Sequence, residues 1–167
     1  SAAPAAKIMA VIKANAYGHG MVAVAKSLPD VDAFAVARVP EAIKLREHGV
    51  TASIVLLAGV IDQDELQFAV EGDFQPVVHC HEQIELLENC DGGAVTVWLK
   101  FDTGMNRLGF DPSEAEELIE RLRGMQPVKE LRLMTHLSSA DELDSRFTRT
   151  QIEKFRQLTE SFDGAVS

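Results

Sequence analysis

Cysteine is scarce in this sequence: Cys80 and Cys90 are its two thiols, and no Cys-x-x-Cys pair occurs. This spacing argues against a disulfide scaffold or a thiolate zinc site, so we expect reduced thiols in a cytoplasmic protein and no metal site. Long apolar runs are missing too, since none approaches the roughly 20 residues of a membrane-spanning helix. The N-terminus has no basic segment like that of a signal peptide and no initiator Met, which suggests a truncated or processed chain.

Basic residues are outnumbered, with 16 Lys and Arg against 26 Asp and Glu and a net charge of −10. Such a protein repels phosphate backbones and anionic lipid surfaces, which argues against nucleic-acid and membrane partners. A local basic site for one small phosphorylated ligand stays compatible with this charge. The 167 residues are enough for one domain with a hydrophobic core.

Short apolar runs alternate with amphipathic stretches along the whole chain. Because several runs are apolar at nearly every position, they predict strands buried on both faces of a parallel sheet. The predicted strands cover residues 8–14, 33–37, 53–58, 74–80, 95–101 and 131–137. Six such units suit either a complete doubly wound open sheet or part of a (β/α)8 barrel, which usually needs about 250 residues. We favour a TIM-type barrel truncated to about six βα units, with a seventh strand beginning within residues 163–167.

Helix ends are marked between these strands. Pro40 opens a segment that closes at Gly49. Asp62 and Asp111 each precede a Glu by three residues, as in capping boxes. Late in the chain, apolar residues at helical spacing predict a long helix; they are Ile152, Phe155, Leu158 and Phe162.

Ligands of parallel β/α folds bind at the carboxyl ends of the strands, and the first strand ends on a lysine. Lys13 is followed by Ala-Asn-Ala-Tyr-Gly-His-Gly. A buried lysine has a lowered pKa, and its neutral amine can attack an aldehyde; alternatively, Lys13 extends to solvent. The glycines let backbone amides approach an anion. Tyr17 either donates a hydrogen bond to a phosphate or packs in the core, and His19 is expected in an exposed or structural loop role.

Two further clusters follow later strands. Lys100 and Asp102 share one strand face, and Arg107 in the next loop is suited to clamping a carboxylate. The alternative is a surface Lys–Asp pair with a solvated arginine. His136 ends the sixth predicted strand, where a hydrogen-bonded structural role is the simpler alternative. Lys13, Arg107 and His136 all lie at or after the carboxyl ends of predicted strands, and chance explains the three together less easily than each alone.

Three strings resemble landmarks of one family. Val-Ile-Lys-Ala-Asn-Ala-Tyr-Gly-His-Gly (11–20) resembles the pyridoxal-phosphate attachment motif of alanine racemases. Leu-Lys-Phe-Asp-Thr-Gly-Met-Asn-Arg-Leu-Gly (99–109) and Thr-His-Leu-Ser-Ser-Ala-Asp (135–141) resemble the second and third landmarks, in the same order and at similar intervals. The resemblance covers essentially the whole chain.

The resemblance implies that residues 1–167 are a partial N-terminal barrel domain that binds pyridoxal 5'-phosphate, without the family's C-terminal β-domain. Lys13 would hold the cofactor as an internal aldimine and, once alanine forms the external aldimine, act as base toward the D-enantiomer. Tyr17 would bind the cofactor phosphate, and Arg107 would lie near the substrate carboxylate. Lys100 matches a lysine that many members carbamylate, and His136 would lie beside the pyridine ring.

The same resemblance implies a cytoplasmic homodimer that interconverts L- and D-alanine and supplies D-alanine for peptidoglycan. The family's second base is a tyrosine from the partner subunit's C-terminal domain, whereas Tyr17 is the one tyrosine here. We therefore expect the 167-residue chain alone to be inactive, to bind cofactor weakly and to self-associate through unpaired strand edges. The alternatives are a broad-specificity amino-acid racemase and a non-catalytic pyridoxal-phosphate barrel protein.

Overall fold

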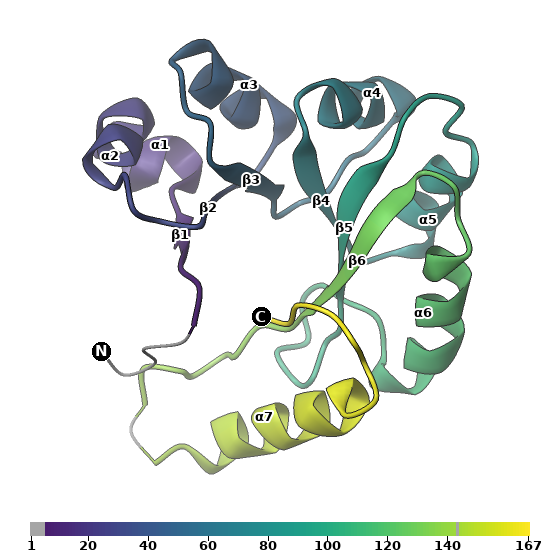
Figure 1. Ribbon diagram of the computed structural model, residues 1–167. Coiled ribbons are helices and arrows are strands. Elements are labelled where there is room, and N and C mark those ends of the chain that lie inside the picture. The colour runs from purple at the N-terminus through teal and green to yellow at the C-terminus, as the bar shows by residue number, and fades with distance from the viewer. Residues whose placement is uncertain (1–5, 143) are drawn as a thin grey trace. The chain divides into compact units, whose positions relative to one another are not determined.

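The computed structural model describes residues 6–142 and 144–167. The chain forms two compact units, residues 1–77 and 78–167, which are described separately. In both units, strands alternate with helices and the paired strands run parallel (Figure 1). The predicted α/β class, with six parallel strands alternating with helices, is confirmed.

The first unit contains four strands in chain order, β1 next to β2, β2 next to β3 and β3 next to β4. Their register sets Ala10 beside Phe34, Phe34 beside Ile54 and Ile54 beside Phe74. Phe34, Ile54 and Phe74 are almost fully buried, as expected for strands covered on both faces. The strands are β1 (Met9–Val11), β2 (Ala33–Val36), β3 (Ser53–Leu56) and β4 (Phe74–Val78).

Four helices connect or follow these strands: α1 (Lys13–Tyr17), α2 (Met21–Ser27), α3 (Val39–Glu47) and α4 (Gln63–Glu71). The predicted start of α4 is confirmed, because the Asp62 carboxylate accepts a hydrogen bond from the Glu65 amide at 2.8 Å. Gly49 follows α3 with a φ of +82°, a left-handed conformation that glycine tolerates well. The first strand is shorter than predicted and ends at Val11.

The second unit pairs β5 (Val95–Lys100) with β6 (Val128–Met134), from Val95 beside Val128 to Lys100 beside Met134. The prediction of the sixth strand at 131–137 was displaced. The strand begins at Val128, earlier than predicted. The prediction missed its first half because Lys129 and Glu130 are exposed and interrupt the apolar pattern. The helices are α5 (His81–Glu88), the 3-10 turn η1 (Pro112–Glu114), α6 (Ala115–Arg123) and α7 (Arg146–Thr159).

The end of the chain returns to β6, as Figure 1 shows. Val166 bridges Leu133 in parallel, and the amide of Ser167 donates to the Leu133 carbonyl at 2.9 Å. The predicted start of a seventh strand is therefore confirmed. In contrast, α7 stops at Thr159, before Phe162, so the prediction of one apolar helix through Phe162 was wrong at its end.

Both cysteines are free thiols. Within the described ranges, no helix has the length and hydropathy to cross a bilayer, and no group of three His, Cys, Asp or Glu side chains is arranged to hold a metal ion.

Candidate active site

Lys13 begins a turn with unusual handedness. Ile12 before it is buried, and Lys13 itself is half-buried. Residues 14–17 all have φ between 51° and 55°, so four consecutive non-glycine residues form a left-handed helical turn. This conformation costs L-residues about 1–2 kcal/mol each, so surrounding contacts must hold it. The expected strand end at Lys13 is thus a turn, because the backbone reverses its handedness there.

Local hydrogen bonds close this turn. The amide of Ala16 donates to the Ile12 carbonyl at 2.8 Å, and that of Gly20 donates to the Asn15 carbonyl at 2.9 Å. The Asn15 side chain accepts from the Met21 amide at 3.0 Å, which joins the turn to the start of α2. Gly18 and Gly20 both have a φ of +91°, which explains the need for glycine at these two positions.

The exposed side of the turn carries Tyr17 and His19. Tyr17 is 61% exposed, so the alternative that it packs in the core was wrong. Its hydroxyl is accessible to a ligand, and its role toward a phosphate stays a prediction. The expectation that His19 occupies an exposed loop is confirmed.

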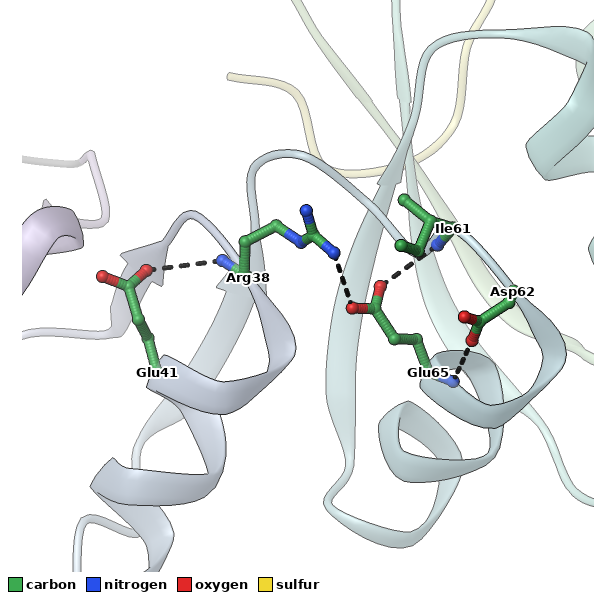
Figure 2. Close-up of polar contacts among 5 residues, drawn as sticks. All are labelled: Arg38, Glu41, Ile61, Asp62 and Glu65. Atoms are coloured by element: carbon green, nitrogen blue, oxygen red, sulfur yellow. Dashed lines mark hydrogen bonds and ion pairs between the residues drawn. The ribbon is translucent and has the colours of Figure 1, made fainter.

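Carboxylates from α3 and α4 tie the loops of the first unit together. Glu41, in the first turn of α3, accepts hydrogen bonds from the amides of Ala14 and Ala37, both at 2.7 Å. Glu65, in the first turn of α4, accepts from the Arg38 guanidinium at 2.8 Å and from the Ile61 amide at 3.1 Å. Figure 2 shows Arg38 between these two carboxylates, with Glu41 directed at its backbone and Glu65 at its side chain.

Lys100 and Asp102 lie at the end of β5 in different environments. Lys100 is the last residue of the strand and only 7% exposed, so the alternative of a surface Lys–Asp pair was wrong. Partial burial by itself raises the pKa of Asp102. Hydrogen bonds from the backbone amides of residues 104–107 outweigh burial, and the pKa of Asp102 lies below its ordinary value.

Asp102 shapes the loop that carries Arg107. Its two carboxylate oxygens accept from the amides of Gly104 at 2.8 Å and Arg107 at 2.9 Å. The Arg107 side chain is exposed, which fits both a ligand-binding role and the alternative of a solvated arginine. Asp102 was predicted only as a neighbour of Lys100, and its position just before a Thr-Gly turn was the signal for this capping role.

His136 belongs to a loop held by a buried glutamine that the sequence interpretation missed. His136 lies two residues beyond β6 and its side chain is exposed. Gln151 of α7 is fully buried; its amide donates to the His136 carbonyl at 3.0 Å, and its oxygen accepts from the Ser138 amide at 3.0 Å. Thr103 and Thr135 share a hydrogen bond of 2.8 Å, which joins the loops after β5 and β6.

The predicted site residues therefore divide between the two units. Lys13 and Tyr17 share one turn in the first unit. Lys100, Arg107 and His136 lie in the second, each at or shortly after the carboxyl end of a strand. Hydrogen bonds connect the two loops of the second unit through Thr103 and Thr135. The convergence of all five residues on one cofactor stays a prediction.

Comparison with known proteins gives one consistent family. A family described as "Alanine racemase, N-terminal domain" matches residues 1–166. Alanine racemases of Aliivibrio salmonicida and Vibrio parahaemolyticus are 47% and 49% identical to this chain, each covering 99% of it. The chain spans 47% of the length of either protein, so it corresponds to about half of these relatives.

Solved structures agree with the sequence comparison. The biosynthetic alanine racemase of Pseudomonas aeruginosa superposes with a TM-score of 0.89 at 39% identity, covering 97% of this chain and 46% of that one. An alanine racemase of Clostridium difficile gives a TM-score of 0.85 at 31% identity, covering 96% and 47%. These matches confirm the predicted correspondence to the N-terminal barrel portion of such enzymes. The chain belongs to the alanine racemase family and represents its N-terminal domain.

Proposed function

We propose that this chain is the cofactor-binding portion of a racemase that interconverts L- and D-alanine with pyridoxal 5'-phosphate. The observation that carries the proposal is the Lys13 turn, in a chain that belongs to the alanine racemase family. A half-buried lysine, an exposed tyrosine and a glycine-containing turn lie within eight residues of one another. This set suits a cofactor that has both an aldehyde and a phosphate.

Each predicted residue has one role in the proposal. Lys13 holds the cofactor covalently through its ε-amine, and the Tyr17 hydroxyl donates to the phosphate. Arg107 binds the substrate carboxylate through its guanidinium. His136 lies beside the pyridine ring, and Lys100 is a candidate for carbamylation that would orient Arg107. Residues 1–167 then form part of a β/α barrel domain, whose remaining units and C-terminal domain belong to the rest of the enzyme.

When bound, pyridoxal phosphate supplies an electron sink that acidifies the proton on the substrate Cα. Racemisation then needs one base on each face of the planar carbon. The Lys13 amine, released when the amine of alanine takes its place on the cofactor, would serve the face of the D-enantiomer, taking or returning the proton there. The opposite face requires another group, because Tyr17 is the chain's one tyrosine and is assigned to the phosphate. We assign that second base to a partner subunit in a cytoplasmic homodimer, which supplies D-alanine for peptidoglycan.

The proposal is tested by chemical trapping and by racemase assay on the protein at its natural length. Borohydride reduction in the presence of pyridoxal phosphate should fix the cofactor on Lys13, as located by peptide mass spectrometry. Lys13→Ala should abolish both this label and the interconversion of alanine enantiomers. Lys26→Ala, which removes an exposed lysine from α2, is the matched control and should preserve both. A label on another lysine, or racemisation of serine as fast as alanine, would contradict the proposed site or the proposed substrate.

A further inference from the structure

Glu41 makes a contact that its position in the helix does not require. A glutamate at the third position of a helix commonly accepts from the backbone at the helix start. Glu41 does so through one oxygen, which accepts from the amides of Ala37 at 2.7 Å and Arg38 at 3.4 Å. Its other oxygen leaves this local motif and accepts from the amide of Ala14, 27 residues earlier, at 2.7 Å.

The Ala14 amide belongs to the peptide group that follows Lys13. Ala14 is the first of the four left-handed residues, so this peptide immediately precedes the left-handed turn, two residues after β1 ends at Val11. Such a conformation persists only where the surroundings over-determine it. A charge-assisted hydrogen bond at this peptide fixes the direction of the Lys13 backbone, and with it the point from which the ε-amine extends.

On these grounds, and resting on the proposed function, we infer that Glu41 is a positioning residue for Lys13. Its carboxylate joins the loop after β1 to the loop after β2 and so orients the lysine for attack on the cofactor aldehyde. Glu41 does not touch the reacting atoms in this scheme. It acts by holding the Lys13–Ala14 peptide in one orientation.

Glu65 provides a matched control. It occupies the equivalent third position of α4 and likewise accepts from a backbone amide, that of Ile61 at 3.1 Å. Its second oxygen also reaches back to the preceding loop, where it accepts from the Arg38 guanidinium at 2.8 Å (Figure 2). The Glu65 carboxylate bridges the loops after β2 and β3, so its substitution tests loss of a bridging carboxylate without loss of the Ala14 contact.

The experiment compares wild type, Glu41→Gln and Glu65→Gln in the protein at its natural length. The rate constant for capture of pyridoxal phosphate is followed by absorbance, with borohydride trapping to locate the label, and Tm is measured without cofactor. A glutamine can accept at one oxygen only, and its NH2 group faces an amide donor. We expect Glu41→Gln to slow capture at Lys13 about tenfold or more and Glu65→Gln to stay within about twofold, with similar losses of Tm.

Equal capture rates in Glu41→Gln and wild type would overturn the inference, as would equal slowing by Glu65→Gln. Absence of a Lys13 label in wild type would instead overturn the proposed function itself. Hydrogen exchange in the wild-type protein tests the contact even if a variant does not fold. The Ala14 amide should be protected, although its side chain is exposed, and free exchange at that amide would refute the role of Glu41.

Discussion

Replacing Gln151 with leucine should lower the free energy of unfolding far more than the same replacement at an exposed glutamine of α7. Gln151 is fully buried, and it bonds to the His136 carbonyl, the Ser138 amide and, at 3.4 Å, the Thr103 hydroxyl. Leucine has a similar size but leaves two backbone groups without their partner, at about 1–3 kcal/mol each. The more apolar side chain returns about 1–2 kcal/mol through burial. Taking the middle of each range, we expect a net loss of about 2–3 kcal/mol.

The control is Gln157→Leu on the same helix. Gln157 is exposed and donates a hydrogen bond to the Glu153 carboxylate within α7 at 3.2 Å, a helix-surface pair that contributes about 0.2–0.5 kcal/mol. Urea unfolding followed by circular dichroism gives the free energy of unfolding of each protein. With a slope of about 1–3 kcal/mol per molar urea, Gln151→Leu should lower the midpoint by roughly 1–2 M. If the two variants unfold within about 0.5 kcal/mol of each other, the argument from buried polar partners is wrong.

Three other changes test the loops and caps by the same unfolding assay. Gly109→Ala should cost roughly 3 kcal/mol or more, because its φ is +131° and an added Cβ would lie 2.6 Å from the backbone nitrogen of Asp102; Gly49→Ala, which meets no atom within 4 Å in the described part of the chain, should cost about 1 kcal/mol. Asp62→Ala should lower the free energy of unfolding by about 1 kcal/mol because it removes the α4 cap, whereas Asp64→Ala, two residues later in the first turn, should lower it by about a few tenths of a kcal/mol. Equal losses would contradict the capping role. Because the pKa of Asp102 is lowered in the folded state, its ionisation stabilises the fold above its ordinary pKa of 3.8, and this contribution is lost as the pH falls through the lowered value. The stability gap between wild type and Asp102→Asn should thus be wide near about pH 6 and narrow near about pH 2.5, and a constant gap would refute this assignment.

The alternation of strands and helices could be predicted because it depends on burial, which apolar runs report directly. The strands at Ala33–Val36 and Phe74–Val78 are buried at every position, and both were predicted to within two residues. The sixth strand was displaced because exposed Lys129 and Glu130 interrupt its apolar pattern. Caps at Asp62 and Asp111 could be predicted because they depend only on near neighbours in the sequence.

The left-handed turn after Lys13 could not be predicted in the same way. Alanine and tyrosine disfavour positive φ, so local preference argues against this conformation at residues 14–17. Besides its local hydrogen bonds, the turn has a contact from Glu41, 27 residues after Ala14 in the sequence. For Gln151 a signal did exist, since it lies one helical turn from Thr148 and from Phe155, both half-buried residues of α7. A polar residue on such a face implies a buried hydrogen-bonding role.

The two loops that carry Lys13 and Arg107 differ in where the carboxylate that binds their backbone amides comes from. Each must hold several backbone amides in a non-repeating conformation while a long cationic side chain extends from it. In the second loop Asp102 lies inside the loop itself, and its short side chain suffices to collect nearby amides. In the first loop, the Asn15 side chain already accepts from the Met21 amide at the start of α2. The carboxylate that accepts from the Ala14 amide comes from outside the loop, on Glu41 of α3. The carboxylate contacts of the Arg107 loop are therefore local in sequence, whereas that of the Lys13 loop requires α3 to pack beside it.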